Sequence, residues 1–243
     1  MYQPRTYRHW IRDESLIAFN VVVKETDLYI RASSNLRRKA YKSVLKYRTM
    51  LETYIERNPE FLTSLEPLSV GQDAPRIVKD MAEAASRVGV GPMAAVAGAI
   101  AEFVGKELLA FSPEIIVENG GDIFLNCQRK RTIGIYAGNS PLTGKIGLEI
   151  DAEETPLGIC TSSGTVGHSL SFGKADAVIV LSESATLADA AATAIGNLVS
   201  QPDDIPKGIE FAQGIEGLRG VIIIKDDKLG LCGKIKIIPT STE

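Results

Sequence analysis

The spacing of apolar residues alternates between two periods along the chain. Across residues 36–57 apolar side chains recur every three or four positions, and Asn58 and Pro59 then interrupt the pattern. A period near 3.6 residues that stops at a proline is typical of an amphipathic helix. The same signals predict helices at residues 75–88, 92–109, 185–198 and 206–213.

Other segments alternate with a period of two, between turns rich in Gly, Asn, Pro and charged residues. Strands are expected at 114–118, 122–127, 132–137, 145–151, 157–162 and 175–182, with hairpins within 18–32 and 220–238. The second hairpin turns at Asp226 and Asp227. Runs of strands and runs of helices, without strict alternation, favour an α+β fold with mostly antiparallel sheets and packed helices.

The chain contains no low-complexity segment and no linker long enough to separate independent domains. We therefore expect one domain over residues 1–243. The order of predicted elements also allows two interlocked, loosely similar halves, about 1–113 and 114–243. A chain of this length buries roughly 70% of its unfolded surface, so it needs neither disulfides nor a structural metal to fold.

Charge and composition narrow the classes of function. Twenty-seven basic and 30 acidic residues give a net charge of −3, which argues against nucleic-acid binding driven by bulk charge. The uncharged stretch 88–101 is 14 residues long, whereas a membrane-spanning helix needs about 20. No apolar signal segment follows the basic residues at the start, so we expect a cytoplasmic protein without a membrane span.

Cysteine and histidine are scarce. Cys127, Cys160 and Cys232 form no Cys-x-x-Cys pair, which fits reduced thiols in the cytoplasm. His9 and His168 are the only histidines in the sequence, too few for a zinc site of conventional spacing.

One face of the predicted helix 36–57 is basic. Arg38, Lys42 and Lys46 follow one another at intervals of four residues. Such a face could meet phosphates, but a run of charges is more often simply solvated.

Residues 89–94 match the pattern Gly-x-Gly-x-x-Ala of dinucleotide-binding folds. In those folds the pattern follows a strand, whereas here the preceding residues are predicted to be helical. We interpret it as a turn between two helices. The free N–H groups at the start of the following helix could still accept an anion.

Two loops have compositions suited to a ligand. Asn119-Gly120-Gly121-Asp122 joins two predicted strands and is typical turn chemistry, although Asp122 could also face a ligand. The segment 161–169 contains several hydroxyl groups, two glycines and His168, which suit an oxyanion and a proton transfer near neutral pH. Ser/Gly-rich loops without ligands are also common. Cys160, at the start of this loop, is interpreted as a small buried hydrophobe.

Asp189 and Thr193 lie four residues apart in a predicted helix, so their side chains project from one face. A carboxylate and a hydroxyl are hard oxygen ligands, and Mg²⁺ often takes few protein ligands and completes its shell with water and phosphate. The alternative is structural, because an Asp early in a helix and a Thr bonded to the i−4 carbonyl need no metal.

Taken in order, these segments resemble the ApbE superfamily of FAD:protein FMN transferases. The matching pieces are the Gly/Ala-rich helix after Gly91, ENGGDI at 118–123, CTSSG at 160–164 and SATLADAAATAIG at 184–196. The last is the most specific. The motifs span residues 89–200, under half of the chain, and the first eighty residues match only in the order of elements.

The resemblance implies roles for individual residues. Asp189 and Thr193 correspond to the family's Mg²⁺ ligands, and His168 and Asp122 are the candidates for acid–base catalysis. The residues expected around the flavin nucleotide, FAD or FMN, are Gly120, Gly121, Asp122, Thr161, Ser162, Ser163, Gly164 and Thr165.

The departures from the family pattern concern the substrate side. The family's lysine in the Gly-rich helix is missing, since no lysine precedes Lys106 there, and its HIIDPRTGYP segment is absent, with only His168 near the place of that histidine. The chain therefore resembles a short cytosolic branch that keeps a phosphate-containing ligand and changes or abandons flavin transfer.

The leading hypothesis is Mg²⁺-dependent binding of a flavin or another pyrophosphate-containing nucleotide, with nucleotidyl or flavin transfer or pyrophosphate cleavage as the reaction if the protein is catalytic. The alternative is a non-catalytic accessory protein in sulfur assimilation or cofactor assembly, such as homocysteine formation, that uses Cys160 beside the same pocket. A structural homo-oligomer with a vestigial site is a third possibility. Expected partners are a small-molecule nucleotide, a protein partner or acceptor, and further copies of the chain.

Overall fold

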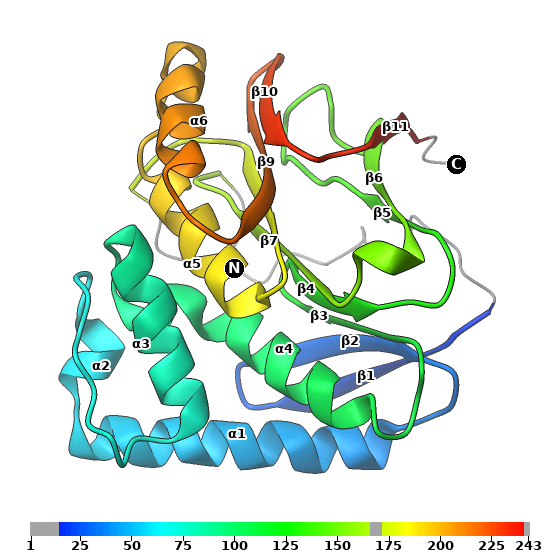
Figure 1. Ribbon diagram of the computed structural model, residues 1–243, viewed down its shortest axis with the longest axis vertical. Helices are drawn as coiled ribbons and strands as arrows, with labels where there is room; N and C mark the ends of the chain where they lie inside the picture. The colour runs from blue at the N-terminus through cyan, green and yellow to red at the C-terminus, as the bar shows by residue number, and fades with distance from the viewer. Residues whose placement is uncertain (1–14, 166–171, 241–243) are drawn as a thin grey trace.

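A computed structural model describes residues 15–165 and 172–240 of the protein (Figure 1). The helices are α1 (Arg37–Arg57), α2 (Glu60–Thr63), α3 (Arg76–Val88), α4 (Val96–Leu108), α5 (Ala185–Gly196) and α6 (Ile205–Gln213), with short 3₁₀ turns at Pro92–Ala95, Ala152–Glu154 and Pro202–Asp204. The strands are β1 (Ile17–Val23), β2 (Thr26–Ala32), β3 (Ile115–Asn119), β4 (Asp122–Asn126), β5 (Arg131–Gly134), β6 (Ile146–Ile150), β7 (Leu157–Ser162), β8 (Ala177–Ser182), β9 (Leu218–Lys225), β10 (Lys228–Gly233) and β11 (Ile237–Pro239).

The strands form two antiparallel sheets. The large sheet has eight strands in the order β1-β2-β3-β4-β7-β8-β9-β10, and the small sheet has three in the order β11-β6-β5. Every pairing between neighbours in both sheets is antiparallel. The predicted α+β class with mostly antiparallel sheets is confirmed. The division into halves stays a prediction, and β2 pairs with β3 across its boundary.

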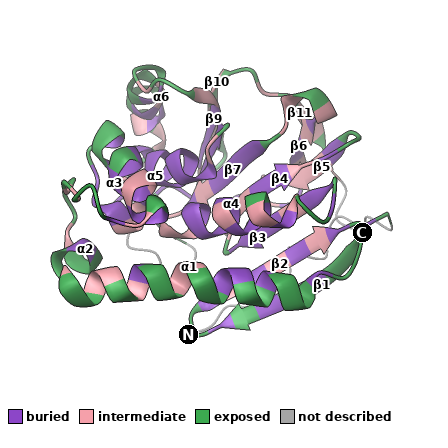
Figure 2. Cartoon of the chain, turned by 60° about the horizontal axis from the view of Figure 1, so that its bottom comes forward, coloured by how far each residue is buried: buried purple, intermediate pink, exposed green. Residues whose placement is uncertain are grey.

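Each face of the large sheet has its own apolar core. Helices α1, α4, α5 and α6 pack on one face, and α3 packs against α5 outside this layer, while the small sheet covers part of the other face (Figures 1 and 2). Alternation along β7 shows the division, because Cys160 is buried in the helix-side core and Ile159 in the core between the sheets. The central strands are therefore buried on both faces, which explains why their sequences are nearly continuously apolar.

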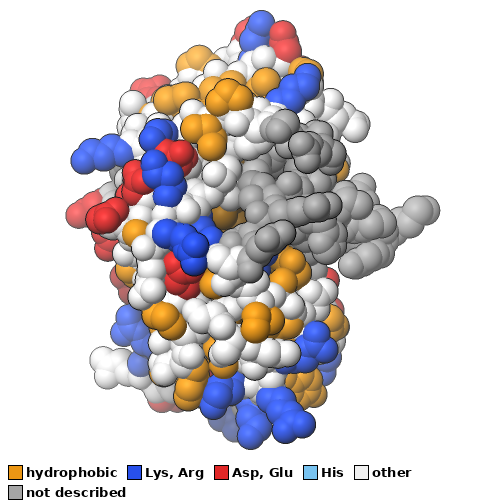
Figure 3. Space-filling view, turned by 90° about the vertical axis from the view of Figure 1, so that its right-hand side faces the viewer, with side chains coloured by type: hydrophobic (Ala, Val, Ile, Leu, Met, Phe, Trp, Pro, Cys, Tyr) orange, Lys and Arg blue, Asp and Glu red, His pale blue; other side chains and the backbone are white. Residues whose placement is uncertain are grey.

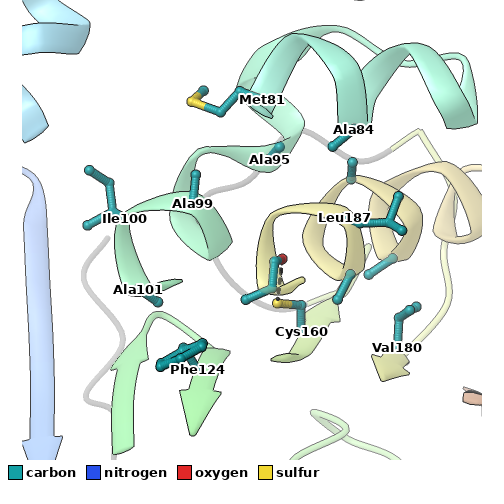
Figure 4. Packing of buried hydrophobic residues seen from close by; sticks show 14 of the residues in the cluster. Met81, Ala84, Ala95, Ala99, Ile100, Ala101, Phe124, Cys160, Val180 and Leu187 are labelled. Atoms are coloured by element: carbon teal, nitrogen blue, oxygen red, sulfur yellow. Dashed lines mark hydrogen bonds between the residues drawn. The ribbon is translucent and has the colours of Figure 1, made fainter. Parts of the chain in front are cut away.

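Small residues let the helices approach the sheet and one another closely (Figure 4). A Cβ added to Gly98 of α4 would lie 2.3 Å from the Ala185 carbonyl oxygen of α5. A Cβ on Gly158 of β7 would lie 2.3 Å from the Ala185 Cα. Side chains larger than hydrogen would separate these backbones, so the glycines fix the position of α5.

Several boundaries differ from the predicted ones. The helix expected at 92–109 begins as a 3₁₀ turn at Pro92–Ala95 before α4 starts at Val96. The strand expected at 132–137 is the shorter β5, and the helix expected at 185–198 ends at Gly196. The α2 turn had no clear periodic signal because it spans only four residues.

The hairpin predicted within residues 220–238 contributes strands to both sheets. β9 and β10 turn at Asp226 and Asp227 as expected, but β10 ends at Gly233, whose φ is +86°. The chain then crosses to the small sheet, where β11 pairs with β6. A left-handed glycine allows this change of direction.

In the described part of the chain, no single helix is both long and apolar enough to cross a bilayer. Only α3 and the segment Pro92–Leu108 reach that length and composition together, and they are bent by 106°.

Candidate functional site

A large pocket opens at the end of the large sheet where the β3–β4 turn meets β7, α5 and the start of α4. Its volume is about 1140 Å³, somewhat above the roughly 300–1,000 Å³ of ordinary ligand pockets. Residues with polar side chains come to it from separate parts of the sequence, together with the turn glycines Gly120 and Gly121: Glu25, Thr63, Ser64, Glu118, Asn119, Asp122, Thr161, Ser162, Ser163, Asp189, Thr193 and Asn197. The fold thus brings most of the predicted site residues together.

The β3–β4 turn places Asp122 at the rim of the sheet. Gly120 and Gly121 have φ values of +70° and +109°, and Asn119 pairs with Asp122 across the turn. A two-residue hairpin turn with both φ values positive strongly favours glycine. The Oδ1 atom of Asp122 accepts a hydrogen bond from the Thr161 N–H at 3.2 Å, which fixes the carboxylate against β7.

Asp189 joins α5 to the start of α4. Its Oδ2 atom accepts a hydrogen bond of 2.8 Å from the N–H of Gly98, in the first turn of α4. The anion that the sequence suggested near this helix start is therefore the chain's own carboxylate. A carboxylate has about four lone-pair positions, so this bond leaves capacity for a ligand in the pocket.

Thr193 lies one turn after Asp189 on α5 and also lines the pocket. Together the two side chains offer a carboxylate and a hydroxyl, with Asp122 on the neighbouring strand. Among the described residues, no group of three or more His, Cys, Asp or Glu side chains is placed to hold a metal ion. This donor set fits Mg²⁺ only as a partial shell completed by water and ligand oxygens.

Three buried carboxylates line the pocket: Glu118, which accepts a hydrogen bond from the Gly121 N–H at 2.9 Å, and the pair Asp122 and Asp189. Burial raises the pKa of Asp189 to about 7, although the N–H groups of Gly98 and Ala97 act in the opposite direction. Burial, and then the charge of Asp189, raise the pKa of Asp122 well above its ordinary value. Within residues 15–165 and 172–240, neither Asp122 nor Asp189 forms an ion pair with a Lys or Arg. A bound cation would relieve both effects.

The hydroxyl-rich loop divides into two parts. Thr161, Ser162 and Ser163 line the pocket, whereas Gly164 and Thr165 do not. Gly164 packs tightly on the backbone of Gly173, and the Thr165 hydroxyl donates to Asp176 Oδ1 at 3.2 Å. His168 lies outside the described residues.

Cys160 lies beneath the pocket and does not line it. The side chain is fully buried, and its Sγ donates to the Ala185 carbonyl at 3.2 Å (dashed line in Figure 4). Burial and the nearby charges of Asp122 and Asp189 raise the pKa of the thiol well above its ordinary value. These surroundings disfavour the reactive thiolate.

Sequence reasoning missed the apolar part of the pocket. Its wall between the two sheets consists of Ile123, Ile133, Ile135, Tyr136, Leu148, Ile159 and Ile179. At the mouth, Leu62, Leu65 and Phe172 are 52%, 54% and 62% exposed. Alternation along the strands indicated inward-facing residues, but it did not reveal that a second sheet would enclose a space.

The sequence also gave no sign of a role for Glu102. This buried residue of α4 accepts hydrogen bonds at its Oε2 from the N–H and the hydroxyl of Thr186, each at 2.9 Å, and from the Ser184 hydroxyl at 3.0 Å. Glu102 therefore caps α5 while Asp189 of α5 caps α4. Each helix thus supplies a carboxylate that accepts hydrogen bonds from the first turn of the other. These bonds fix α5, which carries the candidate metal ligands Asp189 and Thr193, against α4.

Comparison with known proteins identifies the family of the chain. The sequence model of the AbpE bacteria family matches residues 8–210. The UPF0280 protein of Methanocaldococcus jannaschii is 47% identical over 221 residues, which cover 88% of this chain and 90% of that protein. The UPF0280 protein of Methanopyrus kandleri is 44% identical over 226 residues, with coverage of 90% and 91%.

Solved structures show the same architecture. The flavin transferase ApbE from Vibrio cholerae superimposes with a TM-score of 0.57 at 14% identity, over 93% of this chain and 97% of that one. The ApbE protein from Thermotoga maritima gives a TM-score of 0.53 at 14% identity, over 86% and 94%. The fold is that of the ApbE-like superfamily. Within it, the chain belongs to the AbpE bacteria family, together with the UPF0280 proteins.

Proposed function

We propose that the pocket binds FAD, or another nucleotide with a pyrophosphate group, together with Mg²⁺. The observation that carries this proposal is the buried pair Asp122 and Asp189, which has no cationic partner among the described residues and faces Thr193 in a ligand-sized pocket. The fold shared with the flavin transferase ApbE of Vibrio cholerae supports FAD as the first nucleotide to test.

Each part of the pocket suits one part of such a ligand. Asp189 and Thr193 would hold the Mg²⁺, and the hydroxyls of Thr161, Ser162 and Ser163 would donate to phosphate oxygens. The apolar wall between the sheets would accept a ring system. The exposed Leu62, Leu65 and Phe172 at the mouth would contact a protein acceptor.

A transfer or cleavage reaction is part of the same proposal. An acceptor oxygen would attack one phosphorus of the pyrophosphate while the other phosphate leaves with the bridging oxygen. The bound metal would neutralise the charge that develops on the phosphate oxygens. Asp122, whose pKa is raised by burial, would take the proton of the acceptor. His168 remains the second candidate for proton transfer.

No structural observation favours the accessory role in sulfur assimilation through a reactive Cys160. The buried, protonated thiol lacks the exposure and the electropositive surroundings of reactive cysteines.

The test is calorimetric titration of the purified protein with FAD, FMN, ADP and riboflavin, each with Mg²⁺ and with EDTA. We expect FAD to bind only weakly without Mg²⁺. Asp189→Asn and Thr193→Val should each weaken Mg²⁺-dependent binding at least about 10-fold, as expected for loss of a metal contact. Asp203→Asn, at an exposed position away from the pocket, is the matched control and should leave binding unchanged.

The four ligands show whether the pocket recognises mainly the pyrophosphate or mainly the flavin ring. Binding of FAD and ADP with similar affinity would identify the pyrophosphate as the main determinant, whereas binding of FAD and riboflavin but not ADP would identify the flavin ring. Failure of all the nucleotides to bind in the presence of Mg²⁺ would refute the proposal.

A further inference from the structure

The outer side of α1 carries a continuous row of solvent-facing side chains. We call this row the α1 stripe: Arg38, Tyr41, Lys42, Leu45, Thr49, Glu52, Thr53 and Glu56. At about 100° per residue these positions fall within about 120° of one side of the helix. All are exposed except Glu52, which is half-buried. α1 lies along the lower edge of the molecule in Figure 1, and Figure 2 shows exposed residues along its length in green.

Charge along the α1 stripe changes sign from one end to the other. Arg38 and Lys42 lie in the first half, Glu52 and Glu56 lie in the second, and uncharged residues lie between them. The basic half is part of a longer bias, because residues 28–51 contain seven Lys and Arg and no acidic residue. Lys and Arg side chains accordingly gather at the lower end of the molecule, where α1 lies (Figure 3).

This order of charges works against the stability of α1 as a single helix. Acidic residues stabilise a helix near its N-terminus and basic residues near its C-terminus, but the first turn of α1 contains no acidic residue. The pairs Arg38–Lys42 and Glu52–Glu56 place like charges at i,i+4, which is also unfavourable. Arg57 in the last turn and the Arg48–Glu52 ion pair at i,i+4 do stabilise the helix, but neither accounts for Arg38, Lys42 and Glu56.

An antiparallel copy of the same helix matches the pattern at every position. We propose that the α1 stripe is an interface with a second copy of this chain, formed across a two-fold axis near residue 47. Arg38 then lies opposite Glu56 of the second copy, and Lys42 lies opposite its Glu52. Tyr41 faces Thr53, and Leu45 faces Thr49. A two-fold axis repeats each contact, and the two helix dipoles run in opposite directions.

The pair Arg38–Glu56 contributes most of the specificity of the proposed interface. Glu52 already accepts hydrogen bonds from Lys24 at 2.7 Å and Arg48 at 2.8 Å in its own chain. Arg38 and Glu56, by contrast, form no ion pair with any described residue of their own chain. The interface also removes apolar surface from water, because Tyr41 and Leu45 are 49% and 45% exposed. One helix pair buries a small area, so the association should depend on concentration.

The test is sedimentation equilibrium of the full chain over a range of concentrations. We expect a monomer–dimer equilibrium that weakens as salt is raised to about 0.5 M, because the pairs are exposed. Arg38→Glu or Glu56→Arg alone creates two like-charge contacts per dimer and should raise the dissociation constant roughly 10- to 100-fold.

Two-fold symmetry allows a stricter test with the same variants. In an equimolar mixture of Arg38→Glu and Glu56→Arg chains, the mixed dimer contains one native pair and one reversed pair, both attractive. The mixture, and the chain with both substitutions, should therefore regain an affinity within about 3-fold of the original chain. Arg37→Glu, at an exposed position outside the stripe and about 100° around the helix from Arg38 and Glu56, is the matched control and should have little effect.

Three outcomes would overturn the proposal: a chain that stays monomeric at all concentrations, a dimer that is insensitive to Arg38→Glu, and single variants whose dimers are not restored by mixing. No residue of the α1 stripe lines the pocket, so these outcomes are independent of nucleotide binding.

Discussion

Buried carboxylates occur in two different settings in this protein. Directly before β3, Glu114 is buried with Arg131, forms an ion pair with it, and accepts a hydrogen bond from the Gln128 N–H at 2.7 Å. In the pocket, Asp122 and Asp189 are buried beside each other, and the described residues provide no cation. The first setting is complete within the chain, whereas the second would be completed by a ligand or a metal.

The largest expected effect comes from breaking the complete setting. Arg131→Met removes the buried cation of Glu114 and leaves only the more exposed Arg129, whose Nε lies 3.9 Å from the carboxylate, so it should cost up to about 3–5 kcal/mol of folding free energy. For a chain of this size we expect the melting temperature to fall by roughly 10 °C. Thermal unfolding monitored by circular dichroism measures it. The double variant Glu114→Leu, Arg131→Met removes both charges and should recover most of the loss. Equal melting temperatures for Arg131→Met and the original chain would contradict this account.

A smaller effect of opposite sign is expected in the pocket. Asp122→Asn removes one of two neighbouring negative charges, while the new amide oxygen can still accept the Thr161 hydrogen bond. At pH 8 and without ligands, we expect the melting temperature to rise by about 2–4 °C, equivalent to about 1 kcal/mol. Glu114→Gln is the contrasting variant, since it weakens an existing ion pair and should lower the melting temperature. A destabilised Asp122→Asn chain would show that the pocket tolerates both charges without a cation.

An effect of similar size is expected in the dependence of stability on pH. Burial raises the pKa of Asp189 to about 7, above its ordinary unfolded value of 3.8. A carboxyl group with a raised pKa in the folded state contributes stability at low pH and loses it as the pH rises through the folded pKa. Because of Asp189, the ligand-free protein should melt at a higher temperature at pH 6 than at pH 8.

Stabilisation by Mg²⁺ should increase with pH, because the ion requires the deprotonated carboxylate of Asp189. The stabilising effect of the ion should be larger at pH 8 than at pH 6, and Asp189→Asn should abolish the difference. A Mg²⁺ effect that is independent of pH would argue against Asp189 as a ligand. Differential scanning calorimetry at both pH values measures these effects.

Local patterns explain which parts of this molecule were predictable from its sequence. The spacing of Asp189 and Thr193 on one helix, and the paired glycines before Asp122, are signals contained within a few residues. The fold brings both into one pocket as expected, although their roles stay predictions. Contacts between distant residues were not predictable. Glu102 caps a helix that begins more than 80 residues later, and Arg131 meets Glu114 across 17 positions. No sequence period records such pairs.

The capping bond from Gly98 to Asp189 connects the pocket to the backbone of α4. A ligand that draws this carboxylate outward competes with the amide proton of Gly98 for the same group, while a ligand that accepts its present position stabilises the bond. Hydrogen bonding in the first turn of α4 therefore depends on whether the pocket holds a ligand. The rate of amide exchange with solvent in this turn would distinguish a ligand that fits the existing geometry from one that must first rearrange it.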